Sequence, residues 1–206
     1  MKLFATITSI ILHPLLMLTY GMLLVLQLTY LSIYPATVKL YLAGGAFLCT
    51  AVVPGLLVLL MIRLSPAKDL ELSNRHERAI PYLIFITSHI ICFFYLYRMH
   101  VPFWLLSLFI GACVALLVAL CINFYWKISV HAIGTGGLLG ALMGISRIQM
   151  INPFGMFIVV FVAAGLVCTA RVLLKKHTLM QVYAGFGLGF ICTFGASVVS
   201  YFYLFI

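Results

Sequence analysis

The chain has 206 residues, of which 66% are hydrophobic and only 7% are charged. A soluble domain cannot hide that much apolar surface from water, so the composition excludes a water-soluble enzyme and predicts an integral membrane protein. The formal charge of +9 comes from 12 Lys and Arg residues, which lie in small groups between apolar runs. That distribution excludes a basic face that follows a nucleic-acid backbone, and it favours anionic membrane lipid or a small phosphate as the partner.

Apolar segments divide the chain into candidate membrane spans of about 20 residues each. The connections between them are too short for a soluble domain, so we expect one all-α domain over residues 1–206. This would be a polytopic transmembrane helical bundle with about six to seven spans, in a multi-pass protein of the cell membrane. The predicted spans run from about Ile7 to Ile33, Tyr41 to Ile62, Ile80 to Tyr97, Pro102 to Trp126, Ser129 to Ile148, Pro153 to Ala170 and Met180 to Phe205.

Small residues are concentrated in the fifth and seventh predicted spans. They allow helix backbones to approach closely where hydrophobicity gives no drive for association, so these two spans are predicted to be central. The residues concerned are Ala132, Gly134, Gly136, Gly137, Gly140, Ala141 and Gly144, and then Ala184, Gly185, Gly187 and Gly189.

Seven crossings would place most of the ionisable residues on one face of the membrane. The positive-inside rule explains such a bias without any site and would make this face cytoplasmic. That explanation is sufficient for Arg63, Lys175 and Lys176. The face also carries Lys68, Arg75, Arg78, Lys127, His131, Arg171, His177 and the three carboxylates Asp69, Glu71 and Glu77.

The junction before the fifth span has the features of an anion-binding helix end. Ser129 stands where it can cap the helix, and the amides that follow, beginning at Val130, point out of the helix. A helix N-terminus carries a partial positive charge, and Lys127 adds a full one beside it. His131 lies in the first turn, where an ionisable side chain at a membrane boundary indicates a functional site.

The connection before the seventh span adds a second histidine. Arg171 offers a planar guanidinium that suits two phosphate oxygens, and His177 follows six residues later, close enough to line the same pocket. Two histidines, several cations and a helix end together favour phosphoryl transfer through a histidine nucleophile.

Three segments of the chain resemble the motifs of the type 2 phosphatidic acid phosphatase superfamily of membrane lipid phosphatases. The family motifs are Lys-x6-Arg-Pro, Pro-Ser-Gly-His and Ser-Arg-x5-His-x3-Asp. In this sequence they correspond, in the same order, to Lys68-x6-Arg75-His76, Ile128-Ser129-Val130-His131 and Ala170-Arg171-x5-His177-x3-Gln181. Arg78, with Pro81 beyond it, is the alternative to Arg75.

The resemblance implies an integral membrane phosphatase that acts on a lipid phosphate or diphosphate. His177 would attack phosphorus to form a phosphohistidine, and His131 would protonate the leaving oxygen and then activate water. Lys68, Arg75 or Arg78, Arg171 and the amides after Ser129 would hold the phosphate oxygens. Neither a metal nor another cofactor is implied. Gln181 stands in place of the family's Asp, so its amide oxygen would orient His177 without adding charge.

Two other functions stay open at this stage. A non-catalytic family member that binds lipid or scaffolds partners is favoured by Gln181 and by the altered second motif. A small transporter would account for the helical bundle, although it predicts charged or broken-helix features deep in the membrane. His13 and His89 are interpreted as interhelical hydrogen-bond partners. The sequence does not indicate the lipid, the oligomeric state or the side of the membrane: charge bias favours the cytoplasm, and the resemblance implies the outer face.

Overall fold

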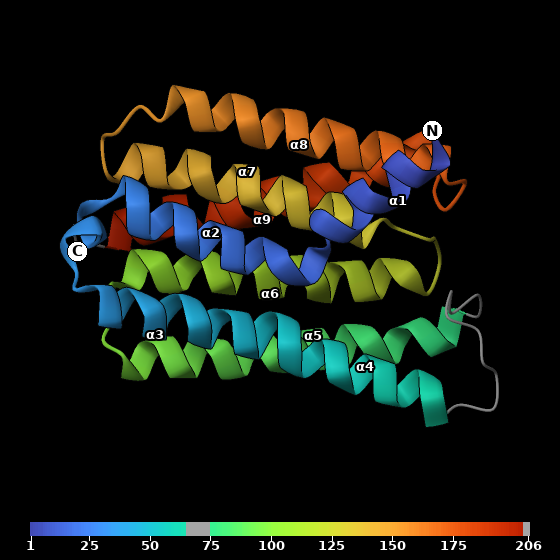
Figure 1. The fold of residues 1–206 in the computed structure, drawn as a ribbon, viewed down its shortest axis with the longest axis horizontal. Helices are drawn as coiled ribbons and strands as arrows, with labels where there is room; N and C mark the ends of the chain where they lie inside the picture. The colour runs from blue at the N-terminus through green and yellow to red at the C-terminus, as the bar shows by residue number, and fades with distance from the viewer. Residues whose placement is uncertain (65–74, 204–206) are drawn as a thin grey trace.

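The computed structural model describes residues 1–64 and 75–203, together with the side chains of residues 1–64 and 79–202. Within these ranges the chain forms helices and their connections, and no strand. Most helices run along one long axis (Figure 1). In chain order the elements are α1 (Lys2–Ile11), α2 (Pro14–Leu28), η1 (Tyr30–Ile33), α3 (Ala36–Phe47), η2 (Leu48–Val52), α4 (Val53–Leu64), α5 (Arg75–Arg98), α6 (Phe103–Asn123), α7 (Val130–Ile148), α8 (Phe154–Leu173) and α9 (Leu179–Tyr203).

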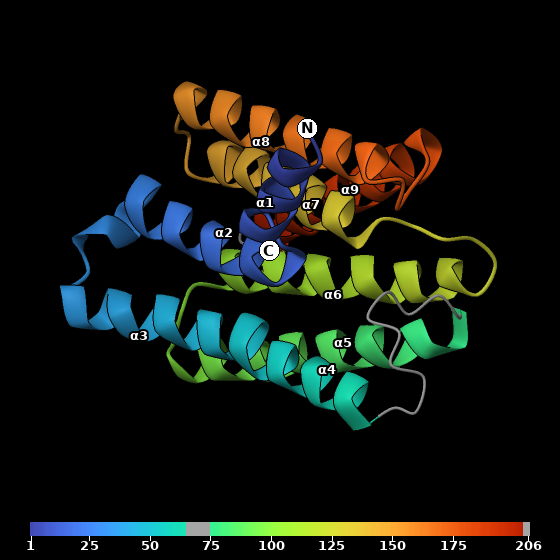
Figure 2. The ribbon, with the colours of Figure 1, turned by 45° about the vertical axis from the view of Figure 1, so that its right-hand side comes forward.

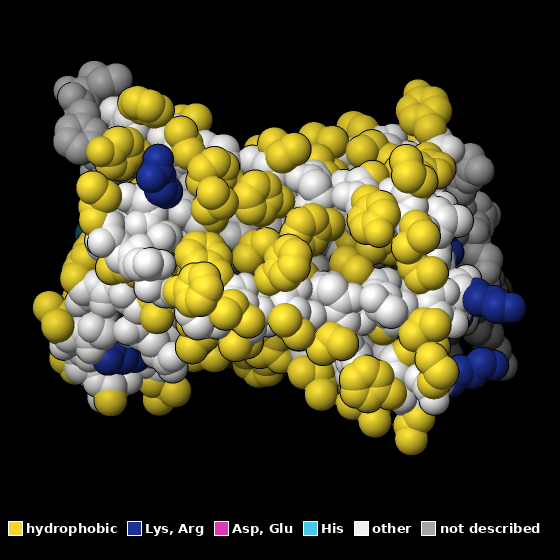
Figure 3. Space-filling view, turned by 90° about the horizontal axis from the view of Figure 1, so that it is seen from above, with side chains coloured by type: hydrophobic (Ala, Val, Ile, Leu, Met, Phe, Trp, Pro, Cys, Tyr) yellow, Lys and Arg dark blue, Asp and Glu magenta, His cyan; other side chains and the backbone are white. Residues whose placement is uncertain are grey.

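Several of these helices are long and apolar enough to cross a membrane. The described part of the chain contains five such segments, or six if α1 and α2 together form one bent span. Figure 3 shows hydrophobic side chains over the middle of one face and Lys and Arg side chains near its ends, as expected for a protein embedded in a bilayer. The segments are Ala36–Leu64, Ala79–Arg98, Phe103–Asn123, Phe154–Leu173 and Leu179–Phe202. The chain is therefore a multi-pass membrane protein.

The predicted count of six to seven spans is not confirmed. The first predicted span is two helices, α1 and α2, that meet at an angle of 55°. The fifth, α7, is not among the five apolar segments because its many glycines, His131 and Arg147 lower its hydropathy. Its inward face contacts other helices, so α7 needs less apolar surface than a helix exposed to lipid.

Proline residues determine where the N-terminal helices begin and bend. Pro14 is the first residue of α2, where a missing N–H costs nothing and the fixed φ suits a helix. Between α3 and α4 the helix widens into the π-helical segment η2, which ends two residues before Pro54. A proline inside a helix cannot donate to the carbonyl four residues earlier, and a π-bulge is a common way to accommodate such a break.

Helices α7 and α9 form the most closely packed pair, as the small residues predicted. A Cβ added to Gly136 would collide with the carbonyl of Phe186, and one added to Gly189 would collide with the carbonyl of Ile133. Only glycine allows the two backbones to come this near. The prediction that these helices are central is confirmed, since α7 contacts α2, α6 and α8 as well as α9.

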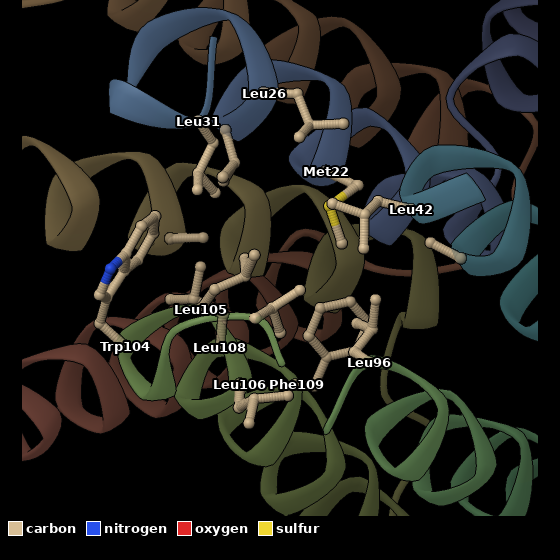
Figure 4. Packing of buried hydrophobic residues seen from close by; sticks show 14 of the residues in the cluster. Met22, Leu26, Leu31, Leu42, Leu96, Trp104, Leu105, Leu106, Leu108 and Phe109 are labelled. Carbon is tan, nitrogen blue, oxygen red and sulfur yellow. The ribbon is translucent and has the colours of Figure 1, made fainter. Parts of the chain in front are cut away.

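The remaining helices pack around this pair in layers. In both ribbon views α8, α7 and α9 lie on one side, α3, α4 and α5 on the other, and α2 and α6 between them (Figures 1 and 2). The main hydrophobic cluster joins α2, α3, α5, α6 and α7 (Figure 4). Its largest fully buried side chains include Met22, Leu31, Leu42, Leu96 and Leu105.

One end of the bundle gathers the segments that carry the second and third motifs. Residue 1, the α6–α7 connection and the α8–α9 connection all lie at this end, which we call the motif end (Figure 1). The α2–α3, α5–α6 and α7–α8 connections lie at the opposite end. The helix directions therefore alternate as seven crossings would require, which is the assumption that placed the second and third motifs on one face in the sequence analysis.

Candidate functional site

The turn after α8 positions Arg171 and His177 relative to each other. The N–H of Lys176 donates to the carbonyl of Arg171 at 3.1 Å, and that of Lys175 donates to the carbonyl of Val172 at 2.9 Å. These are the paired bonds of a Schellman motif, with Lys175 in the left-handed position that glycine usually occupies (φ 54°). The His177 N–H also lies 3.4 Å from the Arg171 carbonyl. The five residues between Arg171 and His177 thus include one tight turn between α8 and α9.

A capping box begins α9 and holds His177. The backbone N–H of Thr178 donates to Gln181 Oε1 at 3.2 Å, and the backbone N–H of Gln181 donates to Thr178 Oγ1 at 3.4 Å. A backbone N–H can only donate, so the side-chain atom of Gln181 that faces the Thr178 N–H is the amide oxygen and not the amide nitrogen. His177 Nδ1 lies 3.2 Å from the same oxygen, so Nδ1 carries a proton and donates it. In the neutral imidazole the lone pair then lies on Nε2.

The start of α7 is joined to the start of α9. Ser129 caps α7 as predicted, with its Oγ accepting from the Ala132 N–H at 3.4 Å. Ser129 is completely buried, and its own N–H donates to the carbonyl of Gln181 at 3.4 Å. A Cβ on Gly185 would lie 2.7 Å from the Ser129 carbonyl, so glycine permits this approach. The second and third motifs therefore meet at the two helix N-termini.

His131 contacts the N-terminal helix pair. Its Nε2 lies 3.2 Å from the carbonyl of Ser9 in α1, and a carbonyl can only accept, so Nε2 carries the proton. The edge of the His131 ring meets His13, with 5.2 Å between the ring centroids and 78° between the planes. His13 stands at the bend between α1 and α2, where its Nδ1 accepts from the Leu15 N–H. The bend thus brings α1 onto the motif end.

Arg171 supplies a partly buried positive charge beside these rings. The guanidinium lies near enough to His13 and His131 for the charges to interact, and His177 lies within the same range of His131. Arg171 Nε is buried and has no hydrogen-bond partner among the described residues. Ser9 Oγ is also buried without a hydrogen-bond partner among the described residues. All three carboxylates of the chain lie within residues 65–78, whose side chains are outside the described part. A partly buried guanidinium with a buried, unused N–H is suited to an anionic ligand.

Four predicted site residues are therefore found together: His131, Arg171, His177 and Gln181. Lys127 lies in the α6–α7 connection at the motif end. The side chain of Val130 lines an apolar cavity, so only its backbone amide is available to a phosphate. Lys68 lies outside the described residues, as do the side chains of Arg75 and Arg78.

Sequence reasoning missed His13 and the Ser9 carbonyl. The expected interhelical hydrogen bonds of His13 and His89 are not found among the described residues, since His13 caps its own helix and His89 bonds its own helix at Phe85. The one local signal was Pro14, which marks a helix start directly after His13. The ring contact with His131 spans more than a hundred residues, and no sequence pattern indicates it. The described side chains include no group of three or more His, Cys, Asp or Glu that could hold a metal ion.

The fold and this cluster define a multi-pass membrane protein with two histidines and an arginine gathered at one end. No family model, curated protein or solved structure matches the chain.

Proposed function

We propose that the chain is an integral membrane lipid phosphatase that hydrolyses a lipid phosphate monoester or a polyprenyl diphosphate through a phosphohistidine. The observation that carries this proposal is the meeting of His131, His177 and Arg171 at one end of the bundle, where Arg171 Nε is buried and has no partner among the described residues. Two imidazoles and one partly buried guanidinium are groups that phosphoryl transfer through histidine requires.

In the first step His177 Nε2 attacks phosphorus while the bond from phosphorus to the lipid oxygen breaks. The bond of Nδ1–H to Gln181 supports this role, because it leaves the lone pair on Nε2 and fixes the plane of the ring. Gln181 is neutral, so it stabilises the positive phosphohistidine less than a carboxylate would. We therefore expect a slower enzyme than one with Asp or Glu at this position.

His131 supplies the proton to the departing lipid oxygen. The proton lies on Nε2 and is donated to the Ser9 carbonyl, a backbone acceptor on α1. As the general acid the ring must start as the imidazolium, with protons on both nitrogens. A lipid oxygen in the place of that carbonyl would receive the Nε2 proton as its bond to phosphorus breaks, which leaves the lipid alcohol and a neutral ring. In the second step the neutral ring takes a proton from water, the water oxygen attacks phosphorus, and the bond to His177 Nε2 breaks to release phosphate.

The charge on the phosphate oxygens must be balanced throughout both steps. Arg171 offers its guanidinium, and the amides of Val130 and His131 stand at the positive end of α7, since Ser129 already satisfies Ala132. The resemblance adds Lys68 and either Arg75 or Arg78 to this set.

The direct test is phosphate release by the purified protein from phosphatidate, phosphatidylglycerol phosphate, a polyprenyl diphosphate and a lipid A phosphate. We expect release from at least one lipid, retention of activity in EDTA and inhibition by vanadate, which mimics five-coordinate phosphorus. Activity that disappears in EDTA and returns with magnesium would contradict the histidine mechanism.

A non-catalytic lipid-phosphate binder is the second candidate. The bond between His131 Nε2 and Ser9 favours it, because that bond occupies the proposed acid. Tight binding of these lipids without any phosphate release would support the binder and reject the enzyme.

A further inference from the structure

An apolar cavity of about 90 Å³ lies directly beside the proposed phosphate site. It is lined by residues from α2, α5, α6, α7 and α9. Pro14 and Val130, which are the chain neighbours of His13 and His131, form part of its wall. Along α7 the lining extends from Val130 to Ile145, which corresponds to about 22 Å of helix. The cavity is thus elongated along the bundle and adjoins the histidines.

His89 is the one ionisable side chain in this wall. The ring nitrogen Nδ1 lies 2.7 Å from the Phe85 carbonyl, so Nδ1 carries the proton and Nε2 presents a lone pair. No hydrogen bond to Nε2 is found among the described residues, and Nε2 is not one of their fully buried unpartnered atoms, so it is accessible to a ligand. The other polar side chain of the lining, Thr193, already donates to the carbonyls of Gly137 and Gly189. His89 Nε2 is therefore the one polar side-chain atom of the described lining that makes no hydrogen bond, within an otherwise apolar wall.

An unused polar atom in the middle of a membrane protein is costly and indicates a ligand that satisfies it. An acceptor is complementary to a hydroxyl group. The long shape suits a hydrocarbon chain, and the position beside His13 and His131 would leave the phosphate of that chain at the proposed site.

We propose that the cavity binds the apolar chain of the lipid phosphate and that His89 Nε2 accepts a hydrogen bond from a hydroxyl group on this chain. The inference rests on the proposed function and narrows it, because the preferred substrate class becomes lipid phosphates with a hydroxylated chain.

The test uses phosphonates, because their carbon–phosphorus bond resists phosphatase hydrolysis and binding is then measured without turnover. The probes are hexadecyl phosphonate and a series of hydroxyhexadecyl phosphonates whose hydroxyl group moves along the chain. Calorimetry on the purified full chain should find one hydroxyl position that binds about tenfold more tightly than the plain chain, as expected when a buried acceptor gains its partner. Equal affinity at every position would overturn the proposal.

Substitution of His89 tests the acceptor itself. His89→Phe keeps a ring in the wall but removes Nε2, so the preference for the hydroxyl should disappear while plain hexadecyl phosphonate still binds. His89→Gln retains an acceptor and should keep part of the preference. A full preference in His89→Phe would contradict the role of His89.

Filling the cavity tests its occupant. Ala112 lines the cavity from α6, and Ala112→Leu should weaken binding of all the phosphonates while maintaining or raising thermal stability, since the new side chain occupies empty space. The control is Gly165→Leu on α8, where an added Cβ meets open space. Undiminished binding in Ala112→Leu would place the lipid chain elsewhere.

Parallel phosphate-release assays separate the two proposals. A hydroxyl preference in binding without phosphate release from any lipid would reject the proposed enzyme and leave the cavity assignment standing. Release from plain and hydroxylated hexadecyl phosphates at equal efficiency, with equal phosphonate affinities, would reject only the cavity assignment.

Discussion

At the residue scale, Gln181 combines a structural role with the proposed chemical one. Its backbone and side chain close the capping box with Thr178, and its amide oxygen holds His177 Nδ1. A glutamine at the third position of a helix is a common capping choice, so the capping box alone is sufficient to explain the residue. The bond to His177 is the additional feature, and substitutions can separate the two roles.

Gln181→Glu should raise the rate of phosphate release without loss of stability. Glutamate retains the capping box, adds favourable charge at a helix N-terminus and stabilises a positive His177. Gln181→Met should lower both the rate and the melting temperature, because it removes the cap and the ring's partner. Activity assays and thermal unfolding of the same preparations check these outcomes. Glu and Met variants of equal activity would show that this residue does not act on His177.

His131→Ala should lower phosphate release from a lipid phosphate by roughly 10² to 10⁴ fold, the usual contribution of a general acid. A phosphate ester with a good leaving group needs no acid, so its phosphorylation of His177 should decrease much less. Steady-state and single-turnover rates on the two substrates provide the comparison. The control is His100→Asn in the α5–α6 connection, where asparagine tolerates the positive φ. Equal losses on both substrates would exclude the acid role.

The site was predictable where it depends on short stretches of chain. The Ser129 cap and the turn from Arg171 to His177 follow from local residue types and spacing. The contacts of His131 with Ser9 and His13 depend on a bend between two helices and on the docking of α1. These are tertiary features, which no local pattern in the sequence encodes.

At the element scale, the approach of α7 and α9 sets the distance between the second and third motifs. Gly136, Gly185 and Gly189 bring each helix against backbone atoms of the other. The same contact joins Ser129 to Gln181 through a backbone hydrogen bond. The glycines therefore determine the geometry of the proposed phosphate site as well as the packing of the bundle.

Gly189→Ala should destabilise the protein by about 1–3 kcal/mol, because the new methyl group would collide with the backbone of Ile133. The matched control is Gly187→Ala on the same helix, where an added Cβ meets open space and alanine improves helix propensity. Thermal or denaturant unfolding in detergent measures the difference. Equal stability of the two variants would mean that the helices do not approach as described.

At the scale of the whole molecule, the helix directions determine which residues share a membrane face. Composition and apolar lengths were enough to predict a helical membrane bundle, and the concentration of small residues identified its central pair. The number of spans could not be predicted, because α7 is polar enough to fall short on hydropathy and still lies between α6 and α8 in the bundle. High hydropathy is needed on helix surfaces that face lipid, and α7 has many residues buried against other helices.

Cysteine accessibility tests this arrangement in membranes. Tyr125 and Met150 are both highly exposed, at 83% and 87%, and lie at opposite ends of α7. In a background without the native cysteines, Tyr125→Cys and Met150→Cys should react with an impermeant maleimide from opposite sides of the membrane. Labelling of both from the same side would show that α7 does not cross, and it would also reveal which face carries the motif end.

The proposed mechanism requires that His177 becomes phosphorylated during turnover. Rapid quenching of the purified protein with a radiolabelled lipid phosphate that it hydrolyses tests this directly. We expect an acid-labile, base-stable phosphoenzyme in the natural protein and in His100→Asn, and neither phosphoenzyme nor phosphate release in His177→Ala. Normal turnover or an undiminished phosphoenzyme in His177→Ala would contradict the account.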